Sequence, residues 1–109
     1  MTRFEFGDIV LLNAFPYFHL SEVKKRPAVV LADTGDYDFI IARITSGDAR
    51  DAYDFVVSSW KQCGLLLASV IRLSKIATLD KRLVLKKLGK LGSPERKKIR
   101  SHLKILFDL

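Results

Sequence analysis

The chain has 109 residues, of which 49% are hydrophobic and 28% are charged, a composition typical of a folded globular domain rather than of a disordered segment. Its apolar runs are too short to cross a bilayer, and residues 1–5 lack the basic-then-apolar pattern of a signal peptide. A single cysteine, Cys63, excludes an internal disulfide and any multi-cysteine metal site. We therefore expect one domain over residues 1–109, in the cytoplasm and without a membrane association.

The net charge of +7 is unevenly distributed along the chain. Residues 1–71 hold seven Lys/Arg and nine Asp/Glu and carry −2, whereas residues 72–109 hold twelve Lys/Arg and three Asp/Glu and carry +9. A basic half on a small domain indicates a polyanion or an acidic protein as partner. It is equally compatible with a solvated face that only keeps the protein in solution.

The first half of the chain predicts three strands and one long loop. Residues 8–13 form an apolar run, and residues 14–26 have no clear period and predict a loop. The β-branched runs 27–32 and 39–45 flank the turn-forming residues 33–36 and therefore predict a hairpin.

The second half predicts further strands and a final helix. Residues 53–58, 68–72 and 75–79 are strand-like, with an irregularity between the last two, while residues 81–91 suit either a helix or a strand. Ser93 is suited to cap a helix that has Pro94 at its first position, and apolar residues then recur at helical spacing at Ile99, Leu103 and Leu106. Short strands followed by one amphipathic helix predict a mainly β fold, a small barrel with a helix packed on it.

Polar residues at strand ends are the first candidates for chemistry. Arg26 precedes a buried strand, and Thr45 and Ser46 close the next one, so the predicted hairpin brings them near one another. Taken singly, Arg26 is better explained as a surface cation and Thr45 as a hydroxyl that caps a turn. The histidines, His19 and His102, have no cysteine or carboxylate at metal-ligand spacing, so we expect no metal and no cofactor.

Five blocks of the sequence resemble the MazF/PemK (Kid) family of toxins from type II toxin–antitoxin systems, in the order and spacing of that family. The blocks are Gly7-Asp8-Ile9-Val10, Arg26-Pro27-Ala28-Val29-Val30-Leu31, Ile44-Thr45-Ser46-Gly47, Ser69-Val70-Ile71-Arg72 and Thr78-Leu79-Asp80-Lys81. The resemblance runs from about Gly7 to the final helix. It implies an SH3-like barrel of the kind shared with the CcdB gyrase poison, working as a homodimer.

The resemblance also implies an activity and a partner. The activity is metal-independent endoribonuclease cleavage of single-stranded RNA, in which the substrate's own 2′-hydroxyl attacks the adjacent phosphorus. The implied partner is an acidic, partly disordered antitoxin protein.

Particular residues of this chain match the family's functional positions. Those expected to take part in catalysis are Arg26, Thr45, Ser46, Arg72 and Glu22. Those expected to contact RNA are His19, Lys24, Lys25, Phe55, Val70, Ser74 and Lys75. For Phe55, packing in the core explains the residue equally well.

The sequence departs from the family pattern at several points. The loop before Arg26 is one residue shorter, and Ser74 stands where the Kid branch carries a carboxylate two residues beyond the arginine. The proline usual before the Ile-Thr-Ser block is replaced, giving Ala42-Arg43-Ile44. These departures leave the general base open between Glu22 and His19.

Three alternatives remain at this point. The chain is compatible with a non-catalytic SH3-like module that binds nucleic acid or protein, and with a gyrase poison of the CcdB type. Because of Ser74, it is also compatible with a toxin that folds but no longer cleaves RNA.

Overall fold

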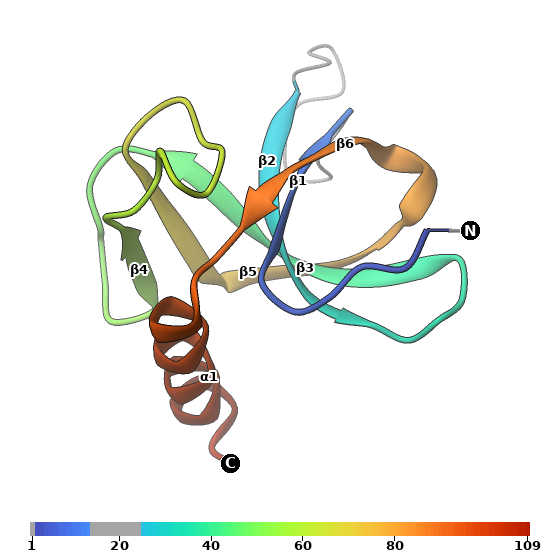
Figure 1. Ribbon diagram of the computed structural model, residues 1–109. Helices are drawn as coiled ribbons and strands as arrows, with labels where there is room; N and C mark the ends of the chain where they lie inside the picture. Colours follow the sequence, from blue (N-terminus) through green and yellow to red (C-terminus); the bar gives the residue numbers. More distant parts are fainter. Residues whose placement is uncertain (1, 14–24) are drawn as a thin grey trace, which may run out of the picture.

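The computed structural model describes residues 2–13 and 25–109 (Figure 1). In this range the elements are β1 (Asp8–Leu12), β2 (Arg26–Asp33), β3 (Asp38–Ser46), β4 (Asp54–Val57), β5 (Ser69–Asp80), the 3-10 turn η1 (Lys81–Leu83), β6 (Val84–Lys90) and α1 (Ser93–Phe107). The fold is mainly β, as predicted, and most predicted strands agree with the observed ones to within one or two residues. Residues 14–24 of the predicted loop lie outside the described residues, and its last residue, Arg26, already belongs to β2. No helix in the described ranges is both long and apolar enough to cross a membrane.

The strands form one antiparallel sheet in the order β4-β5-β3-β2-β1-β6, which curls into a small barrel (Figure 1). The predicted hairpin is confirmed, since β2 pairs with β3 and Val29 lies opposite Ala42. The edge strand β6 meets the segment that follows β4 through a backbone contact between Gly89 and Gly64. A Cβ atom on Gly89 would overlap the carbonyl oxygen of Cys63, and one on Gly64 would overlap that of Leu88. Glycine at both positions therefore permits the approach that closes the barrel.

Two apolar clusters lie on opposite faces of the central strands. The helix-side core contains Ile9, Val29, Ala42, Ile44, Phe55, Val57, Cys63, Leu65, Ile71, Leu73, Leu91 and Ile99. The second core contains Phe4, Val10, Leu12, Ala28, Val30, Phe39, Ile41 and Leu79. Side chains of a strand alternate between its faces, so Arg43 and Thr45 continue the row on β3 that begins with Phe39 and Ile41. The face that holds the second core thus becomes polar toward the end of β3.

A bulge in β5 interrupts its pairing with β3. Ile76 lies opposite Ala42, but the next pair joins Arg72 to Arg43, so residues 73–75 have no partner on β3. This bulge is the irregularity that the sequence predicts between the segments 68–72 and 75–79. It leaves Ser74 and Lys75 exposed to solvent.

The ambiguous segment 81–91 forms η1 and then the edge strand β6, which pairs with β1. The expected cap of α1 is wrong by one residue: Gly92 is the N-cap, no side chain makes a capping hydrogen bond, and Ser93 is already helical. The reason is that the backbone leaves the extended conformation at Gly92, whose carbonyl oxygen accepts from the Arg96 N–H at 3.0 Å. The predicted apolar face of α1 is confirmed, because Ile99 is part of the helix-side core and Leu103 packs against it.

A buried ion pair joins the end of β2 to η1. The Nζ atom of Lys81 lies 2.7 Å from Oδ1 of Asp33, and the Asp33 side chain is only 1% exposed. Asp33 also accepts hydrogen bonds from the backbone N–H groups of Phe4 and Gly35, at 2.7 and 2.8 Å. Burial raises the pKa of Asp33, but these bonds and the charge of Lys81 outweigh it and bring the pKa down to about 2.

This ion pair predicts a stability loss in acid. The folded-state pKa of Asp33 lies below its ordinary value of 3.8, so its contribution to stability is complete above about pH 4 and is lost as the pH falls toward 2. In Asp33→Asn this part of the acid dependence should vanish. At neutral pH the variant should lose about 3–5 kcal/mol of unfolding free energy, because Lys81 is left buried without its partner.

Urea unfolding of both proteins between pH 2 and 7 measures the difference. Asp80→Asn, which breaks an ion pair with the largely exposed Arg82, serves as the matched control and should lose less stability. Equal acid dependence in wild type and Asp33→Asn would contradict this assignment.

Candidate active site

Arginines from three neighbouring strands gather on one face of the barrel. Arg26 begins β2, Arg43 lies in β3 and Arg72 lies in β5, and these strands are adjacent in the sheet. Arg43 is directly opposite Arg72 on one side and opposite Ala28 on the other. Arg26 precedes Ala28 by two residues and so points to the same face. We call Arg26, Arg43, Arg72 and the nearby loop residue Arg50 the arginine cluster.

The hydroxyl of Thr45 borders the arginine cluster, and Ser46 follows it at the end of β3. Thr45 follows Arg43 by two residues on the same face of β3 and pairs with Val70 of β5. Continuing the β2–β3 register by two residues places Thr45 opposite Arg26, as the predicted hairpin requires. The Oγ1 atom of Thr45 donates to the carbonyl oxygen of Ser46 at 3.3 Å, and Ser46 is exposed at the end of the strand.

Arg72 is held in place by a buried carboxylate. Its Nη1 donates to Oδ2 of Asp54 at 2.5 Å, and the two side chains are 10% and 1% exposed. The same Asp54 oxygen accepts from the backbone N–H of Arg50 at 2.7 Å. A guanidinium has five N–H donors, so this contact orients Arg72 and leaves donors for a ligand. The role of Asp54 is not predictable from the sequence, because a lone aspartate at the start of a short strand has no distinctive signature.

The electrostatics of the arginine cluster favour an anion. Partial burial, and then the positive charges of Arg26, Arg72 and Arg50, lower the pKa of the Arg43 guanidinium from its usual value. An arginine still remains protonated at neutral pH. The cluster therefore holds four guanidinium groups near the carboxylate of Asp54, and this excess of positive charge attracts an anion.

Other residues expected to bind RNA lie around the cluster with different exposures. Lys25 is exposed and directly precedes Arg26, and Ser74 and Lys75 are exposed on the bulge of β5. Val70 is buried, at 2% exposure, on the face of β5 that carries Arg72. Glu22, His19 and Lys24 lie outside the described residues.

Phe55 does not lie at the candidate site. It belongs to the helix-side core, and its ring packs edge-on against His102 with the centroids 6.0 Å apart. The alternation of β4 directs Asp54 toward Arg72 and Phe55 to the opposite face. The expectation that Phe55 lines an RNA groove is therefore corrected: the side chain packs between the sheet and α1.

The described residues offer no group of three or more His, Cys, Asp or Glu side chains placed to hold a metal ion. His102 lies in α1, where its Nδ1 is 2.7 Å from the carbonyl oxygen of Lys98. The groups available at the candidate site are thus guanidinium cations, hydroxyls and one carboxylate. Such groups can bind a phosphate and stabilise negative charge that develops on it.

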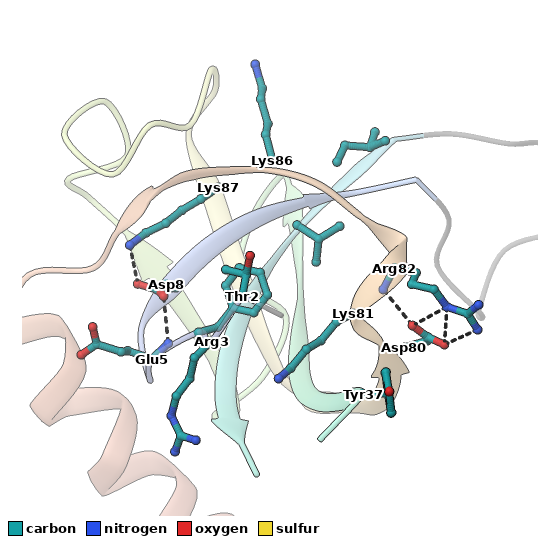
Figure 2. Close-up of a pocket in the computed structure, with 13 residues that line it drawn as sticks. Thr2, Arg3, Glu5, Asp8, Tyr37, Asp80, Lys81, Arg82, Lys86 and Lys87 are labelled. Atoms are coloured by element: carbon teal, nitrogen blue, oxygen red, sulfur yellow. Dashed lines mark hydrogen bonds and ion pairs between the residues drawn. The ribbon is translucent and has the colours of Figure 1, made fainter. Parts of the chain in front are cut away.

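A cavity of about 500 Å³ lies elsewhere, between the N-terminal segment and η1–β6 (Figure 2). Three of its cations form ion pairs: Lys87 with Asp8 at 3.1 Å, Arg82 with Asp80 at 2.8 Å, and Lys81 with Asp33 as described above. The arginine cluster, by contrast, brings Arg26, Arg43 and Arg72 from three adjacent strands onto one face. We therefore place the candidate site at the cluster.

These features define a small β-barrel with a cationic, hydroxyl-bordered face. The family model described as "PemK-like, MazF-like toxin of type II toxin-antitoxin system" matches residues 5–107. The chain therefore belongs to this family of toxins. None of the curated proteins compared with it shows a significant match.

Solved structures agree with the fold. The Mycobacterium tuberculosis toxin MazF-mt6 superposes with a TM-score of 0.76 at 19% identity, over 94% of this chain and 97% of that one. MazF from Deinococcus radiodurans superposes with a TM-score of 0.74 at 19% identity, over 96% of each chain. An endoribonuclease in complex with its cognate antitoxin, from a mycobacterial species, has a TM-score of 0.72 at 16% identity, over 94% of this chain and 93% of that one. At such identities the likeness shows the fold alone.

Proposed function

We propose that this toxin is an endoribonuclease that cleaves single-stranded RNA without a metal, using the substrate's own 2′-hydroxyl as nucleophile. The observation that carries the proposal is the convergence of Arg26, Arg72 and Thr45 on one face of three adjacent strands. Membership of the toxin family supports it, as does the description of a structural neighbour as an endoribonuclease.

The proposed reaction needs charge stabilisation and alignment more than an enzyme nucleophile. The 2′-oxygen forms a bond to phosphorus while the bond from phosphorus to the 5′-oxygen breaks, which leaves a 2′,3′-cyclic phosphate and a 5′-hydroxyl. The 2′-hydroxyl proton passes to a general base, for which Glu22 and His19 are the candidates, and the departing 5′-oxygen takes up a proton from water, whose hydroxide then neutralises the protonated base. Each of these transfers is general acid–base chemistry at neutral pH.

The described residues take the remaining roles. Arg26 and Arg72 give forked, charge-assisted hydrogen bonds to the non-bridging oxygens of the scissile phosphate. Thr45 or Ser46 donates a further hydrogen bond as negative charge builds on phosphorus. Asp54 is a positioning residue, because it fixes the guanidinium of Arg72 through a buried contact.

Neighbouring cations extend this site along the RNA strand. Lys25 lies next to Arg26, and Lys75 and Ser74 project from the bulge of β5 beyond Arg72. We assign these exposed groups to flanking phosphates, where they add affinity without sequence preference.

Incubation of purified protein with a labelled single-stranded RNA in excess EDTA tests the activity. We expect fragments that end in 2′,3′-cyclic phosphate and 5′-hydroxyl groups, while duplex RNA of the same sequence stays intact because its strands cannot splay. RNA that is bound but never cut would identify a non-catalytic binding module or an inactive toxin instead. Trapping of gyrase on DNA without RNA cleavage would identify a gyrase poison.

We infer that the toxin acts in the cytoplasm as a homodimer that an acidic, partly disordered antitoxin segment inhibits. The neighbours from the mycobacterial species and from Deinococcus radiodurans include complexes described as containing an antitoxin or MazE. The +9 charge of residues 72–109 and the arginine cluster suit an acidic segment that folds on binding.

Charge steering predicts how this antitoxin associates. Its on-rate should fall by about tenfold or more as the salt concentration rises from low to molar values, since screening shortens the reach of the toxin's charge. Stopped-flow mixing of toxin and antitoxin at increasing ionic strength measures the on-rate. The homodimer is tested separately: sedimentation of the toxin alone at micromolar concentration should give the mass of two chains. A salt-independent on-rate would contradict electrostatic steering.

A further inference from the structure

Arg43 occupies the central position of the arginine cluster. Its strand, β3, lies between β2 with Arg26 and β5 with Arg72. The three side chains share one face. Arg43 lies opposite Arg72 of β5 and opposite Ala28 of β2, and Arg26 lies two residues before Ala28. A single phosphate in front of β3 is therefore within reach of all three guanidinium groups.

The strand register brings Arg43 close to a second guanidinium, that of Arg72. Like charges directly opposite each other on neighbouring strands destabilise a sheet, and Arg43 and Arg72 form such a pair with limited exposure. The carboxylate of Asp54 contacts Arg72 from β4, on the side of β5 away from β3. Arg43 lies on the β3 side of Arg72, away from Asp54. An anion bound beside Arg43 would therefore reduce the repulsion between the guanidinium groups of Arg43 and Arg72.

Resting on the function proposed above, we propose that Arg43 is a third phosphate-binding guanidinium of the active site, which donates to a non-bridging oxygen of the scissile phosphate. Arg72 is anchored by Asp54 and Arg26 lies at the start of its strand, whereas Arg43 stands between them. Its position is also where the sequence departs from the MazF/PemK pattern, with Ala42-Arg43-Ile44 in place of the usual proline. Arg43 thus adds a phosphate contact that the family resemblance does not imply.

The kinetic test compares Arg43→Gln and Arg43→Lys with wild type. Arg43→Gln keeps a side chain of similar polarity but removes the charge, and it should lower kcat/KM by about 10²-fold, the effect of losing one transition-state donor. Arg43→Lys keeps the charge but loses the forked geometry, so its kcat/KM should lie between those of wild type and Arg43→Gln. The control is Arg82→Gln, at an exposed arginine paired with Asp80 away from the cluster, which should cleave like wild type.

A binding measurement tests Arg43 without relying on cleavage. The probe is the RNA oligonucleotide with one deoxyribose on the 5′ side of the scissile phosphate, which cannot supply the attacking hydroxyl. Its log Kd should depend less steeply on log salt for Arg43→Gln than for wild type, by about 0.7, the value for one phosphate contact on a single strand. Arg43→Lys should keep the wild-type slope, and circular dichroism should show that each variant is folded.

The outcomes separate this inference from the proposed function. A smaller salt slope together with a slower rate for Arg43→Gln supports the assignment. Wild-type rate and slope in Arg43→Gln would overturn it while leaving the ribonuclease proposal intact. If wild type binds the probe but cuts no RNA, the ribonuclease proposal fails, and the salt slope alone then decides whether Arg43 contacts phosphate. An unchanged slope, or a wild type that does not bind the probe, overturns the assignment.

Discussion

Replacement of Arg26 by alanine is expected to reduce RNA cleavage by at least about 10²-fold while leaving the protein folded. The loss follows from removing a charge-assisted donor to the phosphate, which matters most as the phosphate gains charge. The fold should survive, because Arg26 is only partly buried at the start of β2 and belongs to neither apolar core. Single-turnover cleavage rates and circular dichroism measure both parts, and near-wild-type cleavage by a folded Arg26→Ala would refute the assigned role.

Arg72 needs a different design, because its removal affects both activity and stability. Arg72→Gln should lose a comparable share of activity and also about 3–5 kcal/mol of unfolding free energy, since it leaves the Asp54 carboxylate buried without its partner. The double variant Arg72→Gln/Asp54→Asn should regain part of the stability, because no buried charge remains, but should regain no activity. Recovery of cleavage in the double variant would show that Arg72 acts only through the fold.

Much of the fold is predictable from local patterns. The β-branched runs that flank residues 33–36 predict the β2–β3 hairpin, and the spacing of Ile99, Leu103 and Leu106 predicts the buried face of α1. The cap of α1 was misplaced because Ser93 and Gly92 are both good capping residues, and the choice depends on where the backbone leaves the extended strand. Residues 81–91 are ambiguous in the sequence because the strand within them is fixed by its pairing with the distant strand β1, which the local pattern does not reveal.

The candidate site was predictable where it depends on neighbours in sequence and not where it depends on distant ones. The hairpin alone places Arg26 near Thr45. The position of Phe55, by contrast, depends on α1, which covers one face of β4 through His102. The roles of Asp54 and Arg43 depend on the register of β5 against β4 and β3; the sequence predicts an irregularity near residues 73–75 but not the pairing that results from it.

The second large effect concerns the nucleophile. The proposed mechanism places it on the substrate, because the arginine cluster and the Thr45 hydroxyl are suited to stabilise charge on a phosphate. Removing one 2′-hydroxyl should therefore stop cleavage at that linkage and leave binding nearly unchanged, since most of the affinity comes from the phosphates.

The most direct measurement uses two oligonucleotides that differ only in the sugar on the 5′ side of the scissile phosphate, each incubated with the toxin in excess EDTA. We expect the all-ribose strand to be cut to a 2′,3′-cyclic phosphate and a 5′-hydroxyl, and the strand with the single deoxyribose to bind with similar affinity but remain intact. Cleavage of the deoxyribose-containing linkage, or loss of all cleavage when EDTA is added, would contradict it and would point to a water molecule activated by a metal.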